Sequence, residues 1–137
     1  MTQEEKALLL KDLSSRLPYS VKVKIVNEDI LSRDSEEGFI VGKENINDDC
    51  FVIQCSSDSY VLSYSDFKPF LRPMSSMTDE EQRTLDSMCN GVEMVSRLSG
   101  LKMFDKAFDW LNENHFDYTG LIEKGLAIEA PEGMYKN

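Results

Sequence analysis

One short region near the C-terminus holds the residue types that could carry out acid–base chemistry. His115, the only histidine of the chain, is followed by Asp117 and Tyr118, and Trp110 and Tyr135 flank this group. A catalytic histidine needs a nucleophile to activate or a carboxylate that orients it, and this spacing establishes neither. We therefore assign no catalytic residue, and we treat Trp110, His115, Tyr118 and Tyr135 as candidate binding residues.

A structural role for the same region has the stronger sequence signals. In YTGLIEKGL, Gly125 is placed to close a helical turn in left-handed geometry, with Leu126 folding back onto Leu121. The following residues alternate in polarity as an edge strand does, and a turn from Pro131 to Gly133 would return Tyr135 to the body. This region, which we call the C-terminal clasp (residues 110–135), is expected to bury its rings against the core.

The cysteines do not predict a metal centre. The chain has three, Cys50, Cys55 and Cys89, and four residues separate the first two on a predicted strand, so their side chains point to opposite faces. A zinc site usually gathers four ligands in one place, which this spacing does not provide. We expect no metal and no cofactor, and the odd number of cysteines favours a reducing cytoplasm.

The elements that position these residues begin with a helix. Thr2 and Glu5 form a capping box, leucines follow at helical spacing, and Pro18 ends the helix. Alternating polarity then predicts four strands, at Ser20–Val26, Phe39–Val41, Phe51–Cys55 and Tyr60–Tyr64. So small an antiparallel meander should curl into a barrel or be covered by a helix.

The proline-rich segment Phe67–Glu81 is predicted to end the sheet, because Pro69 and Pro73 oppose regular pairing. Thr78 and Glu81 form a second capping box, which predicts a helix with its apolar stripe at Leu85, Met88, Cys89, Val92, Val95 and Leu98. Ser99 and Gly100 would stop that helix. A third helix would follow, with Leu101, Phe104, Ala107, Phe108, Leu111 and His115 on one side.

These elements predict an α+β protein. An N-terminal helix and a small antiparallel meander or barrel-like sheet would occupy residues 1–75, and a helical lobe with an extended tail would occupy residues 76–137. A chain of 137 residues is the usual size of one domain, so we expect the two parts to pack as one unit.

Charge and hydropathy limit the classes of partner that this protein is expected to bind. The net charge is −10, which makes nucleic acid an unlikely partner because too few cations face the phosphates, and no apolar run is long enough to span a membrane. The local exception is a basic patch of Lys6, Lys11, Arg16, Lys22 and Lys24, with Asp12 among them. A patch of this kind is more often a solvated face than an anion site.

Three phrases carry a resemblance to a known group of proteins. LLLKDLSSRLPYSVKV, FKPFLRPMSSMTDEE and FDYTGLIEKGLAIEAPEGMY resemble an uncharacterised family of small proteins from gut bacteria of the Bacteroides group and from their phages and mobile elements. The phrases lie at both ends of the chain and in the proline segment, and they span 51 of its 137 residues. The resemblance implies a cytoplasmic setting and a phage or mobile-element origin, and it carries over no functional residue.

Three function hypotheses remain from the sequence. The leading one is a non-enzymatic protein-binding or regulatory module, because the structural signals are complete and a catalytic set is absent. The second is an acidic effector that mimics nucleic acid and binds a basic host protein, as the charge of −10 allows. The third is a small enzyme that uses His115 with Asp117 or Glu123, and the oligomeric state stays open in all three.

Overall fold

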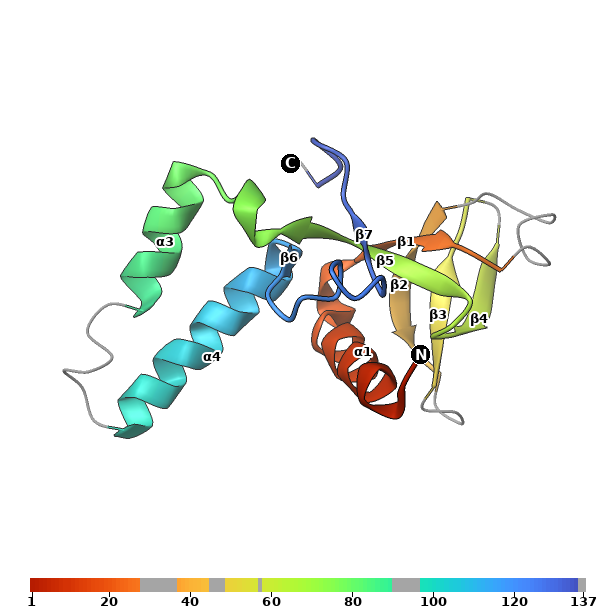
Figure 1. The fold of residues 1–137 in the computed structure, drawn as a ribbon, viewed down its shortest axis with the longest axis horizontal. Helices are drawn as coiled ribbons and strands as arrows, with labels where there is room; N and C mark the ends of the chain where they lie inside the picture. The colour runs from red at the N-terminus through yellow and green to blue at the C-terminus, as the bar shows by residue number, and fades with distance from the viewer. Residues whose placement is uncertain (28–36, 45–48, 57, 90–96, 136–137) are drawn as a thin grey trace.

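The computed structural model describes residues 1–27, 37–44, 49–56, 58–89 and 97–135 of the chain. In these residues an N-terminal helix precedes a mostly antiparallel sheet, and two further helices come later in the chain (Figure 1). The predicted α+β class is confirmed. The predicted boundary between residues 1–75 and 76–137 falls within the short 3-10 helix η2 (Met74–Ser76).

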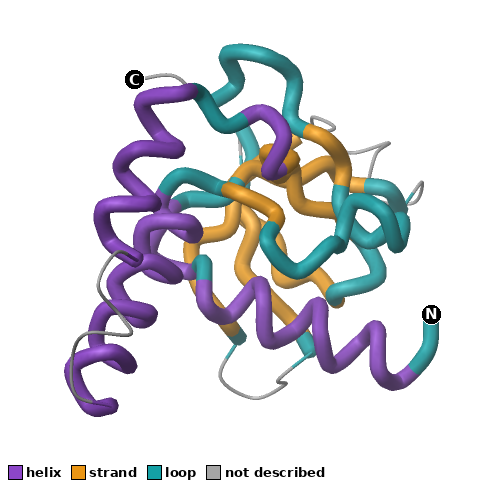
Figure 2. The backbone as a smooth tube through the Cα atoms, turned by 60° about the vertical axis from the view of Figure 1, so that its left-hand side comes forward, coloured by secondary structure: helices purple, strands orange, loops and turns teal. Residues whose placement is uncertain are grey.

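The first helix, α1 (Gln3–Ser15), begins at the predicted capping box. Thr2 Oγ1 accepts a hydrogen bond from Glu5 N at 3.0 Å, and Glu5 Oε1 accepts one from Thr2 N at 3.1 Å. A 3-10 turn, η1 (Leu17–Tyr19), follows where Pro18 cannot continue the α-helix. Leu9 and Leu13 of α1 are buried against the sheet, so α1 covers one of its faces (Figures 1 and 2).

The described residues form a seven-stranded sheet, and its order is β4-β3-β2-β1-β5-β6, with β7 also paired to β5. The strands are β1 (Lys22–Ile25), β2 (Glu37–Lys43), β3 (Cys50–Gln54), β4 (Ser59–Ser63), β5 (Phe67–Pro73), β6 (Phe116–Asp117) and β7 (Ile128–Glu129). The four predicted strands are therefore confirmed, with shifts of a few residues at their ends. Among the described strands β4 does not pair with β5, so the sheet stays open and is covered by a helix.

The predicted end of the sheet before the proline segment is wrong, because β5 runs through it. Val26 N donates to Asp66 O. Hydrogen-bonded and non-hydrogen-bonded pairs alternate along an antiparallel ladder. Val23 and Pro69, three positions further along, are therefore a pair without hydrogen bonds between them. Pro69 therefore loses no bond to β1 by lacking an N–H group. Pro73 is the last residue of β5, where a missing donor interrupts nothing further along the strand.

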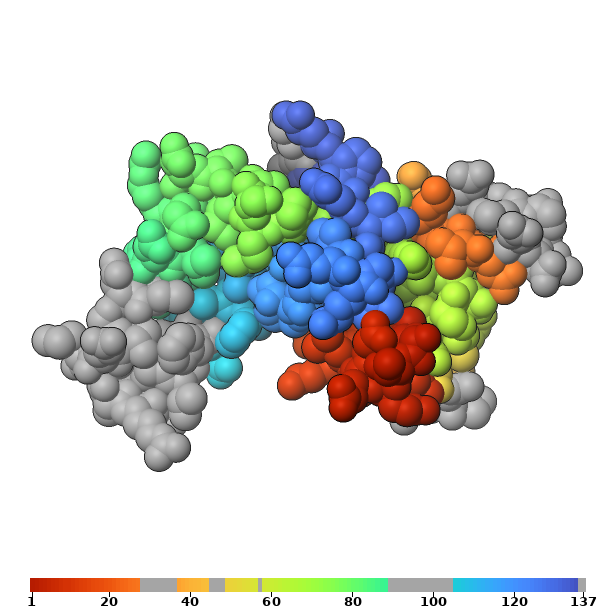
Figure 3. Space-filling view, in the orientation of Figure 1, coloured from red at the N-terminus to blue at the C-terminus, as the bar shows by residue number. Residues whose placement is uncertain are grey.

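The two later helices are α3 (Asp79–Cys89) and α4 (Arg97–Glu113), which pack side by side and stand out from the body that α1 and the sheet form (Figures 1 and 3). The predicted helix stop at Ser99 and Gly100 is wrong, since both lie in the first turn of α4. Glycine costs a helix about 1 kcal/mol relative to alanine, which packing against another helix can offset.

The predicted apolar stripe of the second helix is described only in part, because Val92 and Val95 lie outside the described residues. The placement of Leu98 on that helix is wrong, since it lies on α4. On α4, Ala107 and Leu111 are buried as predicted, but Phe108 is 47% exposed. The ring of Phe108 lies 5.4 Å from that of Tyr118, at the margin of the packed region. The helix pair projects from the sheet (Figure 1), so Leu85 and Met88 of α3 are only half-buried.

The C-terminal clasp has the predicted backbone geometry. Gly125 has φ +74, Leu126 N donates to Leu121 O at 2.9 Å, and Gly125 N donates to Ile122 O at 3.1 Å. This is the Schellman arrangement, formed here by a single turn. The predicted edge strand is also present as β7, which pairs in parallel with β5.

Candidate functional site

The end of α4 turns the chain sharply at His115. His115 N donates to Asn112 O, and His115 has φ 64, a left-handed conformation that histidine adopts more readily than most residues. The turn delivers Phe116 to β5, where Arg72 N donates to His115 O at 2.7 Å. The backbone of His115 therefore links α4 to the sheet.

The imidazole of His115 is enclosed. The residue is 9% exposed, its ring stacks on that of Tyr135 with centroids 3.7 Å apart, and Nδ1 has no hydrogen-bond partner among the described residues. Burial, helped by the positive charges of Arg16, Arg72 and Lys22, lowers the pKa of His115 to about 4. His115 is thus neutral near pH 7, and no carboxylate of the described residues is hydrogen-bonded to its Nδ1.

Tyr135 fastens the tail to two strands at once. Its hydroxyl accepts a hydrogen bond from Lys22 N at 3.0 Å and donates one to Phe70 O at 2.7 Å. It therefore bridges β1 and β5 where their direct ladder ends, and burial raises the pKa of the phenol. Lys22 Nζ donates to Met134 O at 3.0 Å, which adds a second attachment of the tail.

Tyr135→Phe is expected to destabilise the protein by about 1–2 kcal/mol, because Lys22 N and Phe70 O lose the hydroxyl that bridges them. Chemical denaturation followed by tryptophan fluorescence measures this, since Trp110 is the only tryptophan. Tyr19→Phe, at a tyrosine in η1 outside the clasp, is the matched control. Equal stability of Tyr135→Phe and wild type would show that the hydroxyl bridge contributes nothing.

The other two predicted residues have partners of their own. Trp110 stacks on Phe116 with centroids 5.7 Å apart, and the Tyr118 hydroxyl donates to Asn112 Oδ1 at 2.8 Å. The carboxylate of Asp117 accepts hydrogen bonds from Leu121 N and Ile122 N. Of the four predicted binding residues, the structure brings His115 and Tyr135 into ring contact, and Tyr135 is the one of the four that lines the cleft described below.

A buried ion pair lies beneath the clasp. Arg16 is 1% exposed and donates to Asp12 from Nε at 2.6 Å and from Nη2 at 3.2 Å. Nη2 also donates to Phe116 O at 2.6 Å, and Thr119 Oγ1 donates to Asp12. The prediction of a surface basic patch is therefore wrong for Arg16, because this residue is buried and joins α1 to the clasp. The i,i+4 spacing of the pair was the one sequence signal for it.

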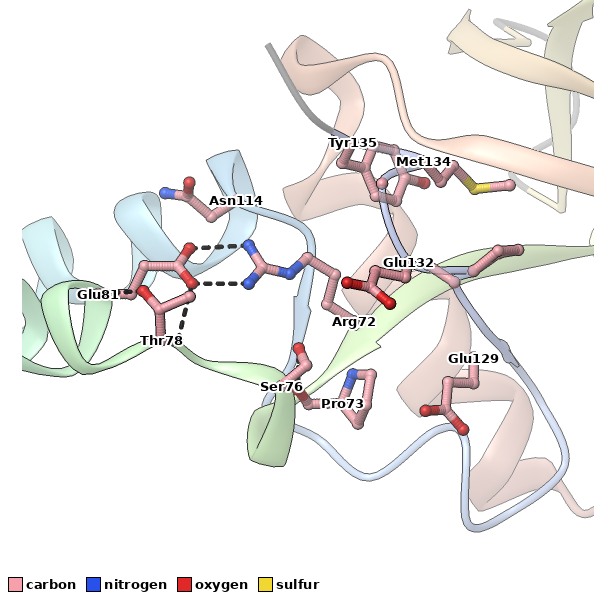
Figure 4. A pocket seen from close by; sticks show the side chains of 13 residues that line it. Arg72, Pro73, Ser76, Thr78, Glu81, Asn114, Glu129, Glu132, Met134 and Tyr135 are labelled. Carbon is pink, nitrogen blue, oxygen red and sulfur yellow. Dashed lines mark hydrogen bonds and ion pairs between the residues drawn. The ribbon is translucent and has the colours of Figure 1, made fainter.

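A cleft of about 610 Å³ opens between the start of α3 and the tail (Figure 4). Arg72 crosses it and donates to both carboxylate oxygens of Glu81, at 2.8 and 2.7 Å, while its guanidinium lies 4.1 Å from the Phe116 ring centroid. Hydrogen bonds from Arg72 lower the pKa of Glu81 to about 2. Glu129 and Glu132 line the opposite wall. Arg72 and Glu81 form an ion pair with each other, so neither side chain is available for acid–base chemistry in the cleft.

The sheet offers a different kind of surface on the side away from α1. Phe39 and Val41 of β2 and Val61 of β4 are 39%, 49% and 57% exposed. Val52 of β3 lies directly opposite Val61, and these side chains alternate with the buried Ile40, Phe51, Ile53 and Leu62. We call Phe39, Val41, Val52 and Val61 the open sheet face. The sequence predicted a wet face for the strands but did not identify these residues as a surface site.

Comparison of the chain with protein-family models, with curated proteins and with solved structures finds no match. Within the described ranges, none of the helices is both long enough and apolar enough to cross a bilayer. The function therefore has to be argued from the surfaces described above.

Proposed function

We propose that this protein is a non-enzymatic protein-binding module that contacts its partner through the open sheet face. The observation that carries the proposal is that Phe39, Val41, Val52 and Val61 lie on three neighbouring strands, with Val52 opposite Val61 on one side and opposite Gly42, which follows Val41 at a register shift, on the other. Single exposed apolar residues are ordinary, but a contiguous apolar patch with a polar rim is typical of interaction sites. The resemblance to phage and mobile-element proteins supports a cytoplasmic setting for this role.

The geometry around His115 gives less support to an enzyme. Its ring is covered by Tyr135, and the nearest acid in sequence, Asp117, accepts two backbone hydrogen bonds instead of orienting the imidazole. A general base must reach the proton that it removes from a substrate. Access to this imidazole would require the tail to leave.

The acidic effector remains a second candidate. It is supported by the net charge of −10 and by Glu129 and Glu132 on the wall of the cleft. Attraction between an acidic protein and a basic partner is screened by salt. Affinity for a basic partner that does not fall as salt rises would contradict this candidate.

Val61→Asp is expected to weaken partner binding at least about tenfold, because it places a charge in the apolar contact at the most exposed of the four side chains. Met74→Asp is the matched control, since Met74 is 40% exposed on η2, away from the open sheet face. Tagged wild type and both variants would be used for affinity purification, and each recovered partner would be purified and titrated by calorimetry. Circular dichroism checks that the variants are folded.

We expect a partner that binds wild type and Met74→Asp with equal affinity and binds Val61→Asp at least about tenfold more weakly. It is contradicted if all three proteins bind each purified partner equally, or if no recovered protein binds the purified wild type.

A further inference from the structure

The open sheet face continues into a group of lysines on β1 and β5. Lys24 lies directly opposite Lys68 in the β1–β5 ladder, and Lys22 lies directly opposite Phe39 in the β1–β2 ladder. Lys22 and Lys24 are exposed and alternate with Val23 and Ile25, which are fully buried. The side chains of Lys22 and Lys24 therefore leave the sheet on the same side as Phe39.

The facing lysines are not explained by the stability of the sheet. Like charges directly opposite each other on neighbouring strands are destabilising. Glu37 lies opposite Lys24 on β2, but among the described residues neither Lys24 nor Lys68 forms an ion pair. Two lysines thus lie opposite each other in the ladder on a protein whose net charge is −10.

We infer that the partner segment recognised by the open sheet face is acidic, with apolar residues that contact Phe39, Val41 and Val61 and carboxylates that reach Lys24 and Lys68. This inference rests on the proposed function and adds the chemistry of the partner. Lys22 marks the border of the surface, because its ammonium group already donates to Met134 O of the tail.

The spacing of the strands limits the partner further. Neighbouring strands lie about 4.8 Å apart, so β2 and β5, which flank β1, are separated by about 10 Å. An extended peptide covers that distance in about three residues, at about 3.3 Å per residue. A segment that crosses the strands would therefore carry its acidic residues about three positions from its apolar ones.

A short acidic peptide fits this surface better than nucleic acid does. A nucleic acid carries a negative charge on every phosphate. The phosphates beyond the lysines would therefore lie against the acidic remainder of the protein and be repelled by it. A peptide can confine its charges to the lysines, and repulsion from more distant acids is screened beyond about 8 Å at physiological salt.

Selection from a random-peptide library displayed on phage, with the full chain as bait, tests the inference. We expect selected peptides to combine Asp or Glu with Leu, Ile, Val or Phe, and to bind in fluorescence anisotropy at least about tenfold more tightly than versions with Asn or Gln in place of the acids. Lys24→Glu/Lys68→Glu should lose this affinity by a similar factor. Lys11→Glu/Lys106→Glu changes the net charge equally at exposed lysines of α1 and α4 and should bind as wild type does.

The variants distinguish a failure of the acidic-partner inference from a failure of the open sheet face as the binding surface. Selected peptides that lose affinity for Val61→Asp but not for Lys24→Glu/Lys68→Glu would overturn the acidic partner and leave the open sheet face as the binding surface. Peptides unaffected by either change would overturn both proposals. Single-stranded oligothymidine that displaces the selected peptides with equal affinity would overturn the choice of an acidic peptide in favour of nucleic acid.

Discussion

Asp12→Ala is expected to lower the free energy of unfolding by about 3–5 kcal/mol, because it leaves the charge of Arg16 buried without a counter-ion. The carboxylate of Asp12 accepts two hydrogen bonds from Arg16 and one from Thr119 Oγ1, and the pair is fully enclosed. Urea denaturation followed by circular dichroism measures the loss. The effect should also reach the clasp, since Arg16 Nη2 donates to Phe116 O.

Two companion variants separate charge burial from packing. Asp12→Leu/Arg16→Met removes both charges and keeps apolar volume, so it should recover most of the stability lost in Asp12→Ala. Lys6→Met removes the partner of Asp49 in a pair that is exposed to solvent and should change stability far less than Asp12→Ala does. A double variant as unstable as Asp12→Ala would contradict the assigned role of the ion pair.

Acidification from pH 6.5 to pH 4 is expected to lower the free energy of unfolding by up to about 3 kcal/mol through His115 alone. The pKa of His115 is about 4 in the folded protein and 6.5 in the unfolded chain. Between these values the unfolded state binds more protons, so stability is complete above pH 6.5 and declines as the pH falls toward 4. Denaturation curves at a series of pH values measure the slope.

His115→Asn is the variant that isolates this contribution. Asparagine does not titrate, and it tolerates the left-handed backbone that position 115 requires. The variant should lose the slope between pH 6.5 and 4 and keep the later decline between pH 4.5 and about 2, where Glu81 becomes protonated. An unchanged slope between pH 6.5 and 4 would assign the effect to other groups.

The elements that the sequence predicted well are those fixed by neighbouring residues. The capping boxes at Thr2 and Thr78 involve partners three residues apart, and the turn at Gly125 depends on one left-handed residue. The alternation in β1 likewise reports which side chains face the core. Each of these signals lies within one element, so a single sequence is sufficient to find it.

The failures involve contacts between distant segments. The effect of Pro69 depends on which edge of β5 its missing N–H faces, and this is set by the register with β1. The burial of Arg16 depends on Phe116 O, which is 100 residues away in sequence. The open sheet face could not be identified either, because alternation shows that strands have two faces but not which face a helix covers.

Titration of the His115 imidazole by proton NMR is the most direct test of the claim that the C-terminal rings form a structural clasp and not a chemical site. The chain has one histidine, so the Cε1 proton resonance has a single source. We expect a midpoint near pH 4, and a higher midpoint after replacement of Tyr135 by alanine, which uncovers the ring. A wild-type midpoint at or above 6.5 would show an accessible imidazole and would contradict the account.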